Sequence, residues 1–212
     1  MLKNKKLFLV TMLICAFGFI VSCGNGNPGS TPETRMDELR KEGIEFDYTM
    51  TTDLIGQSGT MGGKGNYLWI FMQVSSSTSG CIFNYHNDGN SATMYMIMDD
   101  VTVYSTDMNL SEMEESGQSG AEESEILTNI PEWSSFTKTG TVTCAGKTCD
   151  YYEGTGDYAG IEFAYYAEKD LTLYYKETTS QGNKEFQVTS ISFGDDVTIP
   201  TIPPIMTSGT LD

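Results

Sequence analysis

The sequence is short of histidine, with His86 alone among 212 residues. Any Ser-His-acid or Cys-His nucleophile would therefore depend on this one side chain, which stands directly before Asn-Asp-Gly-Asn at 87–90, a run typical of a turn. Adjacent carboxylates such as Asp99 and Asp100 point to opposite faces of a strand, so adjacency builds no acid–base pair. We predict that His86 is an exposed turn residue and that the protein is not an enzyme.

Basic residues are also scarce, at 12 Lys and Arg against 29 Asp and Glu. The first 22 residues hold three of the basic residues and none of the acidic ones, so residues 23–212 carry a formal net charge of −20. Such a surface repels nucleic acid, because binding to phosphates is driven by Lys and Arg. We therefore exclude a nucleic-acid partner and expect a solvated acidic surface.

Complete motifs for a cofactor or a metal ion are missing. The glycine-rich run 56–65 superficially resembles a phosphate loop, but Ser58 replaces the first glycine, and Gly65 stands where Ser or Thr would hold magnesium. Residues 84–95 lack the carboxylates and closing Glu of a calcium loop. A Cys-x4-Cys pair with a distant third cysteine and one histidine is a poor zinc ligand set. We expect neither cofactor nor metal.

The N-terminal segment has the order of an export signal. Three lysines lie within residues 1–6, Leu7 to Val21 is almost unbroken apolar sequence, and Ser22-Cys23 follows. The apolar run is shorter than the roughly 20 residues of a membrane-spanning helix, and polar residues follow it directly. We therefore predict a removable signal at residues 1–22. Without a twin arginine, the general secretion route is favoured.

Ile20-Val21-Ser22-Cys23 resembles the bacterial lipobox. The resemblance implies that diacylglycerol is attached to Cys23 and that the chain is cut between Ser22 and Cys23. We therefore expect a lipoprotein of the cell envelope that faces away from the cytoplasm, with residues 23–30 as a Gly- and Asn-rich tether and 31–212 as one domain. Whether the host has one membrane or two is left open.

Three cysteines remain behind the anchor: Cys81, Cys144 and Cys149. Ala145-Gly146 is typical of a turn between two short strands, so a disulfide between Cys144 and Cys149 is plausible across that hairpin. The alternative is that Cys81 pairs with one of them and leaves the other free.

Most of the domain has the two-residue period of strands. Phe46, Tyr48 and Met50 alternate with polar residues, and Tyr67 to Val74 is apolar on both parities, as in a strand covered on both sides. Before them, residues 31–43 have a helix pattern with Thr31 as N-cap and a stop at Gly43. Further strands are expected at 81–85, 92–98, 101–105, 139–144, 148–153, 161–167, 171–176 and 185–193, with an acidic loop at 111–125, a short helical insertion within 126–136 and a proline-rich extended exit at 199–204.

These features predict a mainly β (α+β) fold: a curved antiparallel sheet or incompletely closed barrel with a leading helix. The order of elements, and the run Thr-Val-Thr-Cys-Ala-Gly-Lys-Thr-Cys-Asp-Tyr-Tyr at 141–152, resemble the LolA/LolB/LppX-like lipoprotein superfamily. The resemblance implies a curved open barrel around an apolar cavity, and several members of that superfamily bind acyl chains. The resemblance does not assign a functional role to any individual residue of this chain.

Three methionines, Met94, Met96 and Met98, share one face of the expected strand 92–98. Methionine suits adaptable apolar cavities, so these side chains, with Trp69 and Phe71, are candidates for lining a lipid site. The alternative is that they fill an ordinary core. The sequence thus predicts a membrane-anchored, non-enzymatic lipoprotein that binds a lipid or another apolar molecule, or else a structural or protein-interaction module with a filled core.

Overall fold

The computed structural model describes residues 38–53, 56–74, 77–87, 91–99, 101–109, 133–180 and 182–204. The expected signal, Ser22 and Cys23, the tether, the first residues of the leading helix and the acidic loop lie outside the described residues.

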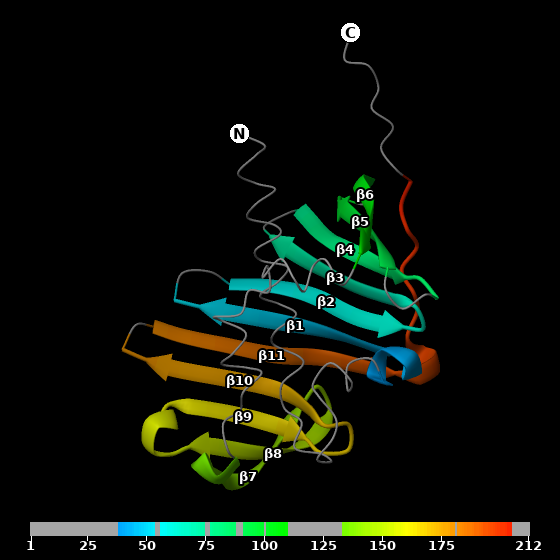
Figure 1. Cartoon of the computed structure of the whole chain (residues 1–212). Helices are drawn as coiled ribbons and strands as arrows, with labels where there is room; N and C mark the ends of the chain where they lie inside the picture. Colours follow the sequence, from blue (N-terminus) through cyan, green and yellow to red (C-terminus); the bar gives the residue numbers. More distant parts are fainter. Residues whose placement is uncertain are drawn as a thin grey trace.

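Eleven strands form one antiparallel sheet in the order β6-β5-β4-β3-β2-β1-β11-β10-β9-β8-β7 (Figure 1). The sheet is open, because β6 and β7 end this order at opposite edges. The mainly β, open-sheet prediction is therefore confirmed. In chain order the strands are β1 (Ile44–Thr52), β2 (Gly56–Lys64), β3 (Tyr67–Val74), β4 (Ser77–Tyr85), β5 (Ser91–Met98), β6 (Val101–Asn109), β7 (Phe136–Cys144), β8 (Lys147–Gly154), β9 (Ile161–Tyr166), β10 (Leu171–Thr179) and β11 (Gly182–Phe193).

The sheet consists of two meanders joined by one long-range pairing. Strands β1 to β6 pair in sequence, and so do β7 to β11. The first and last strands of the chain, β1 and β11, then pair with each other from Ile44 opposite Phe193 to Thr52 opposite Lys184. A bulge between Asp47 and Tyr48 interrupts this register.

Strand β2 is an element that sequence analysis missed. The run 56–65 was considered only as a phosphate loop, and its glycines, which are poor strand formers, do not predict a strand. In the structure its glycines make room for neighbouring side chains. A Cβ on Gly62 would lie 2.5 Å from Cζ2 of Trp69, and one on Gly59 would lie 2.7 Å from Oη of Tyr48. Packing against the neighbouring strands, rather than intrinsic propensity, selects these residues.

The leading helix is described only at residues 38–42, and Gly43 ends it with a φ of +100°, as predicted. The N–H of Gly43 donates to the carbonyl of Leu39 at 2.8 Å, and the carbonyl of Gly43 accepts from the N–H of Gly194 at 2.9 Å. Leu39 is fully buried against the sheet. The expected helical insertion is described only at its end, as a single 3-10 turn at Trp133–Ser135. The next strand therefore starts at Phe136, earlier than predicted.

Two apolar clusters lie on the sheet. The larger one includes Phe46, Met61 and Ile70, and extends through both meanders to Phe163 and Phe186. The smaller cluster comprises Trp69, Ile82, Ile97 and Val197. Successive side chains of a strand point to opposite faces, so Trp69 and Ile70 contribute to different clusters.

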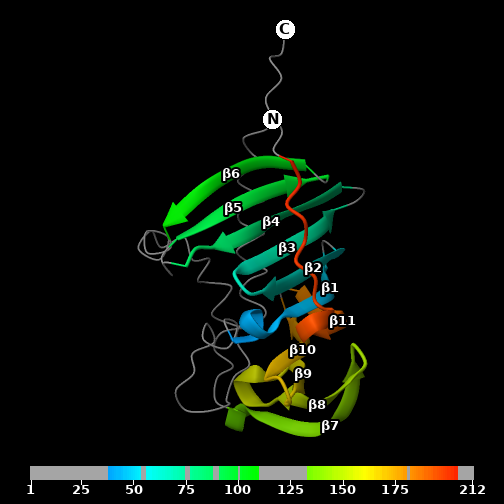
Figure 2. The same ribbon diagram turned by 90° about the vertical axis from the view of Figure 1, so that its right-hand side faces the viewer.

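The segment after β11 covers the smaller cluster. Figure 2 shows it running across the strands from the end of β11 towards β6. The Lys64 ammonium donates to the carbonyl of Val197 at 2.8 Å near its start. At the other end, Thr102 donates its N–H to Pro204 O at 3.2 Å and its hydroxyl to Pro203 O at 2.7 Å. The exit at 199–204 is free of regular secondary structure, as expected of its prolines.

Replacing Thr102, which is fully buried, tests this attachment. Thr102→Val keeps the shape but leaves the carbonyl of Pro203 without its side-chain donor. We expect a loss of about 1 kcal/mol in the free energy of unfolding, measured by urea titration. Thr141→Val, at an exposed position of β7, is the control and should change little. Equal stability of the two variants would show that the hydroxyl bond does not hold the segment.

Candidate functional site

We call the surface of β1–β5 that carries the larger cluster the apolar face. Five methionines of the described residues pack in this cluster. The strand register aligns several of its side chains, since Met61 pairs with Ile70, Ile70 with Cys81, and Cys81 with Met96. The five methionines are Met50, Met61, Met72, Met94 and Met96.

Exposure on the apolar face increases from β2 and β3 towards β6. Met61 and Met72 are buried, whereas Met94 and Met96 on β5 are only half-buried. Met98 is 41% exposed at the end of β5. Tyr104 on β6, directly opposite Met96, is 49% exposed. An adaptable apolar surface is therefore accessible along β5 and the edge strand.

The structure separates the five candidate ligand-lining residues. Met94 and Met96 pack in the larger cluster, but Trp69 and Phe71 belong to the smaller cluster under the C-terminal segment. Because β3 is apolar on both parities, its sequence does not show which parity shares a face with the methionines. In the structure the even-numbered residues Ile70 and Met72 share the face of the methionines. Trp69 and Phe71 are odd-numbered and point to the opposite face, so they cannot line the same surface as Met94.

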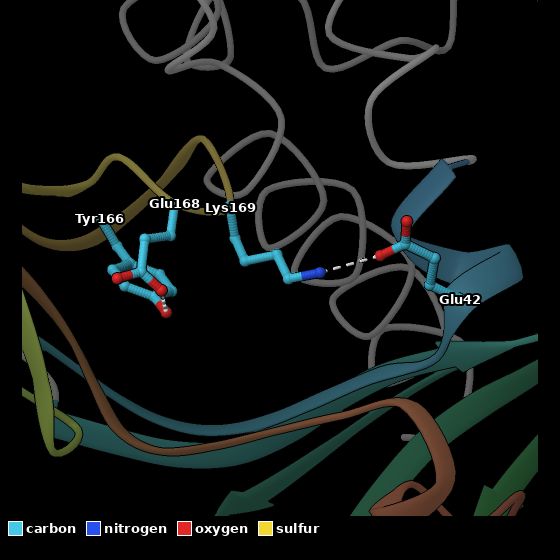
Figure 3. Close-up of polar contacts among 4 residues, drawn as sticks. All are labelled: Glu42, Tyr166, Glu168 and Lys169. Carbon is cyan, nitrogen blue, oxygen red and sulfur yellow. Dashed lines mark hydrogen bonds and ion pairs between the residues drawn. The ribbon is translucent and has the colours of Figure 1, made fainter.

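A polar contact links the leading helix to the turn between β9 and β10 (Figure 3). Lys169 reaches the carboxylate of Glu42 at 3.0 Å, and the Tyr166 hydroxyl donates to Glu168 at 2.7 Å. The Lys169 ammonium also lies 5.4 Å from the ring centroid of Phe193. An ion pair this exposed contributes little stability. Its effect is to orient the turn beside the helix, which packs on the apolar face through Leu39.

His86 is exposed just after β4, as predicted. Its Nδ1 lies 2.8 Å from the Ser91 hydroxyl and its Nε2 lies 2.9 Å from the Thr93 hydroxyl. Thr93 donates to Asp107 at 2.7 Å, so its oxygen is left to accept from His86 Nε2–H, and Nδ1 accepts from Ser91. This hydroxyl network connects the ends of β4, β5 and β6. It was not visible in sequence because Asp107 lies on another strand.

Cys81, Cys144 and Cys149 are buried free thiols in the structure. The predicted Ala-Gly turn is confirmed, with positive φ at both Ala145 and Gly146. Cys144 pairs with Lys147 and Cys149 with Val142, so the two cysteines are diagonal neighbours, and the Cys149 thiol donates to the carbonyl of Lys147 at 3.7 Å. Burial raises the pKa of Cys149 to about 12, and that of Cys81 likewise to about 12.

The Cys144–Cys149 disulfide remains a prediction that peptide mapping can test. We expect protein recovered from an oxidising compartment to carry this bond, since the two cysteines are diagonal neighbours across the hairpin. Cys81 should be alkylated only after unfolding, because a buried thiol with a raised pKa supplies little thiolate. Mass spectrometry of unreduced peptides provides the measurement. A crosslinked peptide that contains Cys81 would support the alternative pairing instead.

Within the described part of the chain, no group of three His, Cys, Asp or Glu side chains is placed to hold a metal ion. No helix in the described part of the chain is long enough and apolar enough to cross a membrane.

The fold and the site define a protein with one large open antiparallel sheet and a methionine-bearing apolar face. No protein-family model matches the chain, and no curated protein matches it. The sheet is similar to a solved structure of MucB in complex with MucA(peri), at 12% identity and a TM-score of 0.37 over 82% of this chain and 61% of that one. The chain thus spans about three-fifths of the MucB chain.

Two further solved structures are similar to parts of the chain. PNGF-II is 10% identical, with a TM-score of 0.34 over 76% of this chain and 29% of that one. A DUF1329 family protein from Desulfovibrio piger is 9% identical, with a TM-score of 0.30 over 77% and 91% of the two chains. Likeness of this degree defines neither a family nor a function, so both must be argued from the chain's own residues.

Proposed function

We propose that the protein is a membrane-anchored, non-enzymatic lipoprotein of the cell envelope that holds a lipid or another apolar molecule against its apolar face. The observation that carries this proposal is the half-buried methionine pair Met94 and Met96, which continues into exposed Met98 and Tyr104. A closed core would bury these side chains as fully as Met61 and Met72. Apolar surface that stays accessible beside a buried cluster is typical of a binding site.

The methionines also suit a ligand without a fixed shape. Their side chains are unbranched and polarisable, so the same surface can adapt to acyl chains of different lengths. Phe83, directly opposite Met94, adds a half-buried aromatic ring. The accessible part of the ligand surface in this proposal therefore runs over β4, β5 and β6, and it excludes Trp69 and Phe71.

The anchor follows from the lipobox-like run that ends at Cys23. Two acyl chains give stable membrane attachment, since each buried methylene contributes about 0.8 kcal/mol. The tether at 23–30 would then keep the acidic domain close to the membrane surface. Attachment of this kind brings the apolar face near a source of lipid.

Replacing Cys23 tests the anchor. Cys23→Ser removes the thiol that carries the diacylglycerol, so we expect the exported protein to move from the membrane fraction to the soluble fraction. Ser22→Thr, which leaves the thiol in place, is the matched control. If Cys23→Ser protein stayed with the membrane after a high-salt wash, or if the native sulfur were unmodified by mass spectrometry, the anchor would be refuted.

Lipid analysis of the exported Cys23→Ser protein tests the ligand. We expect denatured protein to release lipid, and the Met94→Gln/Met96→Gln double variant to release about tenfold less, because polar amides would interrupt the apolar surface. Val103→Gln, at a 37% exposed position outside the larger cluster, is the control and should keep its lipid. A folded wild-type protein free of lipid would favour the protein-interaction module with a filled core.

A further inference from the structure

Two buried polar atoms on the apolar face have no hydrogen-bond partner in the part of the chain that the structure describes. They are the hydroxyl oxygen of Tyr48 on β1 and the amide oxygen of Gln57 on β2. Tyr48 is only 2% exposed. Buried polar groups in proteins are nearly always paired, because an unpaired one has lost its bonds to water without replacement. Two such atoms on neighbouring strands therefore point to a partner from outside the chain.

The register places the two side chains next to each other. Tyr48 pairs with Gly59 and Met50 pairs with Gln57, so Gln57 is the next residue of β2 on the face that Gly59 occupies. Since a Cβ on Gly59 would lie 2.7 Å from the Tyr48 hydroxyl, the glycine leaves that hydroxyl its space. Any larger residue at position 59 would displace it.

Apolar groups surround both atoms. The Tyr48 ring stacks on Phe186 with their centroids 5.6 Å apart, and Met72 lies opposite Gly59. The Gln57 amide nitrogen donates to the sulfur of Met50 at 3.9 Å. That contact directs the amide nitrogen to the thioether and leaves the oxygen as the available acceptor.

Tyr48 and Gln57 together offer one donor and one acceptor. Burial raises the pKa of Tyr48 to about 12, so its hydroxyl keeps its proton at neutral pH and can donate. The Gln57 oxygen can only accept. A group that fits both must accept one hydrogen bond and donate another, which a hydroxyl does. An ionised carboxylate or phosphate fits badly, because its charge would face the Gln57 oxygen in an apolar environment.

We propose that Tyr48 and Gln57 bind the neutral hydroxyl head of an otherwise apolar molecule, such as a long-chain alcohol or an acylglycerol. This inference rests on the proposed function and names its ligand class. The tail would lie along the row Tyr48, Met72 and Met98, which the register aligns across β1 to β5. Four strand spacings of ~4.8 Å make this row about 19 Å long. The row ends at the accessible side of the apolar face.

Two probes that differ in whether the oxygen carries a hydrogen or a methyl group test this inference on the full mature chain carrying Cys23→Ser. 1-Decanol accepts and donates a hydrogen bond, whereas 1-methoxydecane only accepts. We expect the wild-type protein to bind decanol about fivefold more tightly, the worth of one hydrogen bond, as measured by displacement of a fluorescent apolar dye. Gln57→Leu should remove this preference and leave the affinity for the ether within about twofold.

Tyr48→Phe separates ligand binding from stability. The variant keeps the stacked ring, so it should fold at least as stably as wild type, yet bind both probes about fivefold more weakly, because Tyr48 donates to the oxygen that each probe carries. Tyr95→Phe, which removes a hydroxyl from the opposite face of the sheet, is the matched control and should bind both probes as tightly as wild type. If both probes bound the wild-type protein without a preference, or if Tyr48→Phe bound them as tightly as wild type, the head-group inference would be overturned and the proposed function would stand. If neither probe bound, both would fall.

Discussion

The pairing of β1 with β11 is the interaction on which the rest of the structure depends. Each meander is built from neighbouring strands, but only this pairing joins them into a single sheet. It also sets the start and end of the domain side by side, where the N–H of Gly194 donates to the carbonyl of Gly43. The leading helix and the C-terminal segment therefore leave the sheet from the same place, and the larger apolar cluster extends across both meanders.

From this shared place the leading helix and the C-terminal segment pack on opposite faces of the sheet. The helix packs Leu39 into the larger cluster, while the extended C-terminal segment covers Trp69 and ends at Thr102. The smaller cluster is thereby closed. The apolar face is closed around Met61 but remains accessible at Met96, and the proposed binding site rests on this difference.

Sequence analysis succeeded where local chemistry decides the backbone. Gly43 ends a helix and Ala145-Gly146 makes a turn because only a few residues accept positive φ. It failed at β2, where glycines are present for the sake of Trp69 and Tyr48, whose rings lie over them. It also grouped Trp69 with Met94, although they lie on opposite faces. The missing information in both cases was the identity of the strand opposite, which propensity does not contain.

The sequence by itself determined the alternation of apolar and polar residues, the turns between strands and the excess of acidic residues, and it predicts an export signal that ends before Cys23. These are local or compositional properties, and they hold in any arrangement of the strands. Only the tertiary structure decided that β1 meets β11, that Tyr48 and Gln57 share a buried apolar surface, and that Met94 remains accessible. The reason is physical: pairing and burial depend on segments far apart in the chain, and a two-residue period defines two faces without showing what covers either.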